Sequence, residues 1–153
     1  MLQWRSSVIS SAVIFVTLSA SSVLADDVKQ AKAYPAVIEV AMTNKQDGHQ
    51  FMTLSQNPVH AGPVLFRVKN HSPNSVHEFL VLRTDLDPSA LPMEEDGVKV
   101  DESKLSGIKE LGDLEPGKSG QMEMTLSPGH YVLFCNQPGH FRAGMFATLT
   151  VTQ

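Results

Sequence analysis

Cysteine is nearly absent from this sequence, with one residue, Cys135, in a chain of 153. A single thiol forms no intramolecular disulfide and supplies no four-cysteine zinc site. Positive charge is also scarce, because 12 Lys and Arg face 16 Asp and Glu, for a formal net charge of −4. This balance excludes a nucleic-acid binder that depends on a basic surface. The length favours one domain that buries a core without disulfides.

A long apolar stretch is missing everywhere except at the N-terminus. Arg5 is the only charged residue among the first 25, an apolar run covers residues 8–18, and small residues end at Ala25. This pattern predicts a signal peptide over residues 1–25 and export to the periplasm, with an uncleaved N-terminal anchor as the alternative. Residues 26–153 then form a single domain. In an oxidising compartment a lone thiol is either buried or used, and a metal thiolate achieves both.

Short apolar runs separated by turn residues follow along the rest of the chain. Most of them alternate apolar and polar side chains, as strands with one buried face do. Residues 77–83 are apolar on both faces, which is typical of a central strand. The seven runs cover residues 37–42, 50–54, 63–69, 77–83, 119–126, 130–135 and 145–152. They predict an all-β fold, an antiparallel sandwich with Greek-key connections.

Residues 85–118, between the fourth and fifth runs, have a different composition. Up to Glu115 this segment carries ten acidic residues and three lysines, with Pro88 and Pro92 near its start. A short helix is expected around Glu102–Ser106. We interpret the segment as a long crossing loop on the surface, a solvated charged connection. The alternative is an acidic face that steers a basic partner.

The strongest chemical signal is the spacing Cys-x4-His-x4-Met formed by Cys135, His140 and Met145 between two predicted strands. A thiolate, an imidazole and a thioether suit copper far better than magnesium or calcium. A trigonal copper site needs a second imidazole, and His77 at the start of the central strand supplies it. Such a set favours electron transfer, because it suits both oxidation states of copper and little has to move when an electron arrives.

Residues next to these ligands are expected to hold them. Pro138 with Gly139 fixes a turn between the thiolate and the imidazole, and backbone amides near Asn136 are placed to hydrogen-bond the sulfur. Met122 and Met124 share one face of an alternating strand, so we assign them to the core rather than to a Cu(I)-binding cluster. The remaining histidines lie at turns or strand starts and are not assigned to metal: His49, His60, His71 and His130.

His77 and the segment Cys135–Met145 resemble the type 1 copper signature of the cupredoxins, the plastocyanin and azurin family of blue copper proteins. The resemblance implies a sandwich of seven to eight strands and one copper ion per chain. It also implies that His77, Cys135 and His140 are the equatorial ligands and that Met145 is the axial ligand.

The resemblance further implies a transient redox partner, a cytochrome or a copper enzyme, that docks near His140. We expect Phe141 and Phe146 to contribute to an apolar patch there, and the alternative is that both rings pack inward. One residue departs from the family pattern. Many members carry Asn or Ser just after the first histidine, where the side chain ties down the cysteine loop, whereas this chain has Glu78.

The sequence therefore predicts an exported monomeric electron carrier with no catalytic turnover of its own and no stable membrane insertion after signal cleavage. The alternative is a periplasmic copper-delivery protein that uses the same ligands. Multicopper oxidases and copper nitrite reductases need further domains and histidine pairs, and the chain has no His-x-His motif. A binuclear copper centre needs two cysteines.

Overall fold

The computed structural model describes residues 36–45 and 47–153, all of them within the compact unit Ala33–Gln153. The predicted signal peptide, residues 1–25, lies outside the described residues. No helix in the described part of the chain is both long enough and apolar enough to span a membrane.

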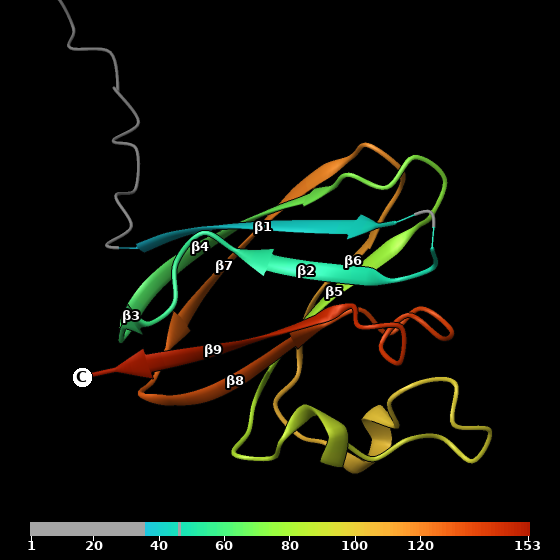
Figure 1. Ribbon diagram of the computed structural model, residues 1–153. Helices are drawn as coiled ribbons and strands as arrows, with labels where there is room; N and C mark the ends of the chain where they lie inside the picture. The colour runs from blue at the N-terminus through green and yellow to red at the C-terminus, as the bar shows by residue number, and fades with distance from the viewer. Residues whose placement is uncertain (1–35, 46) are drawn as a thin grey trace, which may run out of the picture. The chain divides into compact units, whose positions relative to one another are not determined.

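The described residues form two β-sheets that pack face to face (Figure 1). One sheet has the strand order β2-β1-β4-β7 and the other β3-β9-β8-β5-β6. The strands are β1 (Ala36–Asn44), β2 (Gln50–Leu54), β3 (Val59–His60), β4 (Gly62–Asn70), β5 (His77–Arg83), β6 (Lys109–Leu114), β7 (Ser119–Leu126), β8 (Gly129–Phe134) and β9 (Phe146–Thr152). The predicted all-β sandwich is confirmed.

The pairing of the strands corrects one part of that prediction. Five of the described strand pairs are antiparallel, but β1 pairs with β4 and β3 pairs with β9 in parallel. Each of the seven predicted strands is present, and β3 and β6 come in addition. A parallel neighbour requires a crossover rather than a hairpin, and local periodicity carries no information about which distant strand that neighbour is.

The main core lies between the two sheets. Along β4, Val64, Phe66 and Val68 are fully buried, whereas the intervening Arg67 is exposed. Phe66 meets Phe79 of β5 in the opposite sheet, with ring centroids 5.6 Å apart. The predicted core methionines of β7 are confirmed in the same way, because they are partly buried and pack against this core.

A second apolar cluster covers the outer face of β5 and explains why that strand is apolar on both sides. Phe79 and Val81 belong to the core between the sheets, whereas Leu80 and Leu82 belong to this second cluster. Residues 84–108 run over this face (Figure 1) and include the 3-10 helices η1 (Pro88–Ala90) and η2 (Glu102–Lys104).

The segment 85–118 is mostly exposed or half-buried, but it does more than connect two strands through solvent. Leu91 and Val100 are buried in the second cluster, because the outer face of β5 and β8 would otherwise expose apolar side chains to water. The expected short helix is present as η2. The end of the segment is the edge strand β6, which pairs with β5.

Replacing Phe66 with alanine tests the contact between the sheets. We expect Phe66→Ala to lower the free energy of unfolding of the metal-free protein by about 3–5 kcal/mol, because the neighbours of a fully buried ring cannot close the cavity. The control is Leu86, which has 48% relative exposure. Leu86→Ala should change the free energy of unfolding by less than about 0.5 kcal/mol. Urea denaturation measures both, and equal effects would contradict this account of the core.

Candidate metal centre

The pairing of β5 with β8 sets two of the predicted ligands beside each other. His77 is the first residue of β5, and Cys135 follows the last residue of β8. The antiparallel register places Leu80 opposite Phe134, so the start of one strand meets the end of the other. Both His77 and Cys135 have no exposed surface. The third ligand, His140, lies in the loop between β8 and β9 and is half-buried.

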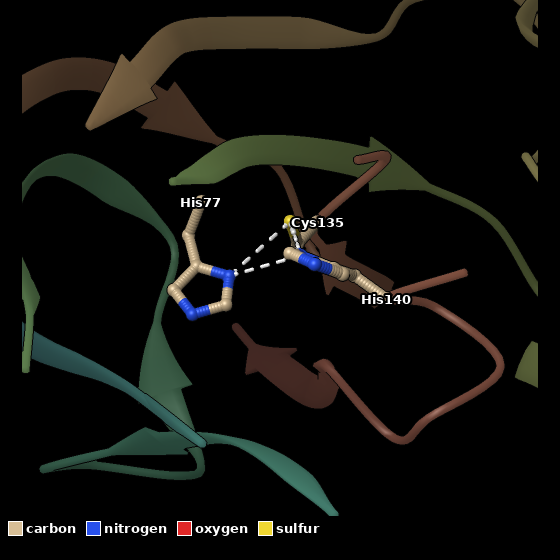
Figure 2. A group of neighbouring side chains, drawn as sticks. All are labelled: His77, Cys135 and His140. Carbon is tan, nitrogen blue, oxygen red and sulfur yellow. Dashed lines mark hydrogen bonds between the residues drawn. The ribbon is translucent and has the colours of Figure 1, made fainter. Parts of the chain in front are cut away.

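Three donor atoms converge at this point. The Nδ1 atoms of His77 and His140 lie 3.1 Å apart, and the Sγ atom of Cys135 lies 3.7 Å from the first and 3.4 Å from the second. Figure 2 shows both imidazoles with these nitrogens turned toward the sulfur. Among the described residues, these three form the one group of His, Cys, Asp and Glu with metal-binding geometry.

The triangle has the size that a first-row metal ion requires. A point equidistant from the three atoms lies about 2 Å from each, close to the roughly 2.0–2.1 Å bond between zinc and an imidazole nitrogen. A trigonal set of two imidazoles and one thiolate with a weak thioether is the arrangement that copper electron-transfer sites use. The donor set therefore fits one copper ion per chain.

The protonation of the site is set by burial. Desolvation lowers the pKa of His77 to about 4, with a further contribution from the positive charge of His140, and it also lowers the pKa of His140. Both imidazoles are therefore neutral at pH 7 and have lone pairs to offer. Desolvation raises the pKa of the Cys135 thiol to about 11. Without a metal the thiol keeps its proton.

Backbone amides surround the sulfur, as predicted. The amide of Glu78 donates to Cys135 Sγ at 3.2 Å, and the amide of Gln137 donates to it as well. The tie between β5 and the cysteine loop is thus made by the main chain of Glu78. A glutamate side chain after the first histidine consequently leaves this tie intact.

The loop from Cys135 to Met145 is closed by its own backbone. The Cys135 amide donates to the Met145 carbonyl and the Met145 amide to the His140 carbonyl, both at 3.0 Å. Met145 is fully buried beside Cys135 in the core, and its role as axial ligand stays a prediction. Gly144 has φ +101°, and a Cβ there would stand 2.8 Å from the Gln50 carbonyl oxygen, so only glycine fits against β2.

The side chain of Asn136 points away from the sulfur and joins the loop to the segment over the second cluster. It accepts from the Val100 amide at 2.8 Å and donates to the Val100 carbonyl at 3.0 Å and to Glu102 Oε1 at 2.7 Å. Asn136 is itself buried. It therefore fixes the residue that follows the thiolate, although it makes no hydrogen bond to the thiolate.

The predicted apolar patch around His140 is only partly present. Phe141 packs inward, with ring centroids 5.8 Å from Phe134 and 5.3 Å from Phe146, and it has 7% relative exposure. Its assignment to an exposed patch was wrong, because the second cluster offers it an apolar environment on the underside of the loop. Phe146 is half-buried and Pro138 is exposed.

Two buried polar residues near the site were not identified from the sequence. Ser72 Oγ lies 2.7 Å from His77 Nε2, and Asn70 Oδ1 accepts from the Ser72 amide at 2.8 Å. Both residues belong to a run of polar and turn-forming residues, and nothing in the composition of that run distinguishes a buried side chain from an exposed one. The sequence offered only the position of Ser72, five residues before His77, and this spacing alone does not predict a contact.

A group of carboxylates lies on the other side of Glu78. Its side chain is hydrogen-bonded to Glu110 of β6, and Glu102 and Asp113 lie near it. The pKa of Glu78 is raised from 4.5 to about 7, mainly by burial, with smaller contributions in the same direction from the hydrogen bond to Glu110 and from the neighbouring negative charges. Two of these neighbours are tied to the cysteine loop, since Gln137 Nε2 donates to Asp113 at 2.7 Å and Asn136 to Glu102.

This pKa predicts a pH-dependent effect of Glu78→Gln. Between pH 4.5 and about 7 the folded protein binds a proton at Glu78 that the unfolded chain has lost, so the stability contributed by this group falls as pH rises. The uncharged amide avoids this loss. We expect Glu78→Gln to be more stable than the parent at pH 8 and to show less gain at pH 5, by urea denaturation of metal-free protein.

The exposed Glu95 supplies the matched control, and Glu95→Gln should change the free energy of unfolding by less than about 0.5 kcal/mol at either pH. The depressed pKa of His77 acts on parent and variant alike and cancels in the comparison. A gain from Glu78→Gln that is larger at pH 5 would contradict the assignment.

Solved structures share this fold, whereas no protein-family model and no curated protein matches the sequence. The auracyanin of the photosynthetic bacterium Roseiflexus castenholzii aligns with a TM-score of 0.53 and 20% identity over 80% of this chain and 100% of that chain. Auracyanin A of Chloroflexus aurantiacus, a "blue" copper protein, gives 0.51 and 19% over 76% and 99%. The copper-containing nitrite reductase of Thermus scotoductus gives 0.55 and 13% over 81% and 32%.

The two auracyanins match along essentially their whole length, whereas this chain spans about a third of the nitrite reductase. The described domain thus matches the whole of each auracyanin but only one part of the nitrite reductase chain. It has the cupredoxin fold, with a donor group for one copper ion at His77, Cys135 and His140.

Proposed function

We propose that this chain is an exported electron carrier with a single copper ion bound by His77, Cys135 and His140 and, more weakly, by Met145. The observation that carries the proposal is the triangle of donor atoms, whose sides of 3.1, 3.7 and 3.4 Å fit one metal ion. A site whose ligands are held by paired strands and a closed loop changes little when the metal changes oxidation state, and small changes make electron transfer fast.

A bound copper ion supplies the one-electron chemistry by alternating between Cu(I) and Cu(II). The protein supplies a fixed environment. The Cys135 thiol gives up its proton to solvent when the metal binds, because the thiolate is the ligand. The amides of Glu78 and Gln137 then donate to a negatively charged sulfur, which strengthens both hydrogen bonds and affects the reduction potential.

The position of His140 supports an electron route through this ligand. His77 and Cys135 are fully buried, whereas the His140 side chain is half-buried and reaches the surface beside the exposed Pro138. We therefore place the docking site of a transient redox partner, a cytochrome or a copper enzyme, around His140. Phe141 is not part of it.

The same burial argues against copper delivery, the second function considered from the sequence. A protein that passes its metal to an acceptor must let the acceptor's ligands replace its own. Here His77 and Cys135 have no exposed surface. His77 is the first residue of β5, and Cys135 directly follows β8, the strand with which β5 pairs. Export rests on the N-terminal sequence pattern, and it suits a chain whose single thiol is buried.

Titration of the metal-free, reduced protein with Cu(II) tests the proposal. We expect an intense visible thiolate-to-copper charge-transfer band that saturates at one equivalent, and Cys135→Ser should abolish it. The exposed His130 lies outside the donor group, so His130→Ala should keep the full band.

Redox cycling of the same sample separates the two functions. If the protein is a carrier, ascorbate should bleach the visible band, the copper should stay bound through gel filtration, and the band should return on reoxidation. Loss of Cu(I) to an added chelator within minutes, without recovery, would support delivery instead. A parent protein that binds no copper at all would end both proposals.

The role of Met145 is tested by Met145→Leu. Leucine keeps the volume of the buried side chain but removes the thioether, and a weak axial ligand tunes the potential without being needed for binding. We expect the variant to retain one copper and its visible band and to have a higher reduction potential by voltammetry. An unchanged potential would show that the methionine sulfur does not ligate.

A further inference from the structure

The turn before β5 holds the outer nitrogen of His77. Nδ1 of this imidazole faces Cys135 and His140, and Nε2, on the other side of the ring, lies 2.7 Å from the hydroxyl oxygen of Ser72. Ser72 has 1% relative exposure and His77 none. Water therefore does not reach this hydrogen bond, and the serine is the partner on which Nε2 depends.

The position of Ser72 is fixed from both sheets. Its amide donates to Asn70 Oδ1 at 2.8 Å, and Asn70 is the fully buried last residue of β4. The Nδ2 atom of Asn70 donates to the carbonyls of Leu114, at the end of β6, and of Ser75, both at 2.8 Å. Asn70 thus joins the ends of β4 and β6, which belong to different sheets. The hydrogen bond from its amide to Asn70 holds Ser72 beside these two strand ends.

The chemistry of the ring explains why a hydroxyl stands here. An imidazole that binds metal through Nδ1 carries its proton on Nε2, and a buried N–H needs an acceptor. In the other neutral tautomer of His77 the proton is on Nδ1, and Nε2 is then an acceptor that needs a donor. A hydroxyl can act as donor or as acceptor by rotating its hydrogen. A backbone carbonyl can only accept and a backbone N–H can only donate, so each would match only one of the two tautomers.

We propose that Ser72 is a positioning residue for the metal ligand His77, and that its hydroxyl pairs with Nε2 in both tautomers and so keeps Nδ1 directed at the metal. The inference rests on the proposed function only in that a metal binds between His77, Cys135 and His140. It extends that function by assigning to Ser72 and Asn70 a role that the ligand motif does not contain.

Three substitutions isolate the hydroxyl. Ser72→Ala removes it, Ser72→Val removes it while adding volume, and Ser72→Thr has nearly the shape of valine but keeps the hydroxyl. Loss of an outer hydrogen bond to a ligating histidine typically weakens metal binding by about 10–100-fold. We expect this loss for Ser72→Ala and Ser72→Val, measured as Cu(I) affinity by competition with a chromophoric chelator, and much less of it for Ser72→Thr.

A second readout reports on the ring itself. Cu(I) is diamagnetic, so imidazole N–H groups of the loaded protein are visible by nitrogen-15 NMR. In the parent we expect a His77 Nε2–H signal that is protected from exchange with water. In Ser72→Val this signal should shift and exchange faster, and in Ser72→Thr it should resemble the parent. A purely structural role would not produce this threonine and valine difference.

The outcomes separate this inference from the proposed function. Equal Cu(I) affinity of Ser72→Val and Ser72→Thr would overturn the role of the hydroxyl, and so would an unprotected Nε2–H in the parent. The parent spectrum needs no variant, so it decides the matter even where a substitution prevents folding. A parent that fails to bind Cu(I) would instead overturn the proposed function.

Discussion

The pairing of β5 with β8 is the constraint on which the rest of the structure depends. It brings His77 and Cys135, which are far apart in the sequence, to one end of the same sheet. The amide of Glu78 then donates to the sulfur across the same pair. Because backbone hydrogen bonds between strands fix this geometry, the positions of His77 and Cys135 follow from the register of the sheet.

Burial gives this site its chemistry and also makes it costly. A neutral thiol and two neutral imidazoles are tolerated in the core because they carry no charge, and desolvation keeps them in that form. The side chain next to the site shows the same effect. Glu78 lies among carboxylates and holds a proton to a higher pH than an exposed glutamate does.

The supports of the ligands come from segments that the ligand motif does not include. Asn136 joins the cysteine loop to Val100 over the second cluster, and Asn70 with Ser72 joins His77 to the ends of both sheets. The segment 84–108 therefore has two roles, since it covers the outer face of β5 and restrains the loop that carries two of the ligands. Loss of such a neighbour typically weakens metal binding by about 10–100-fold, because the neighbour orients the ligand.

The sequence by itself determined what depends on local pattern or residue chemistry. Strands such as β2, β5 and β7 were located from side-chain alternation or apolar runs, because an extended chain turns successive side chains to opposite faces. The donor types and their spacing on one loop indicated a copper site, because thiolate, imidazole and thioether donors suit copper. Tertiary structure decided the rest. The parallel pairing of β1 with β4 involves strands far apart in the sequence, and edge strand β6 lacks a regular alternation. Ser72 became a support of His77, and Phe141 an inward-packing ring, only through the surroundings that distant segments supply.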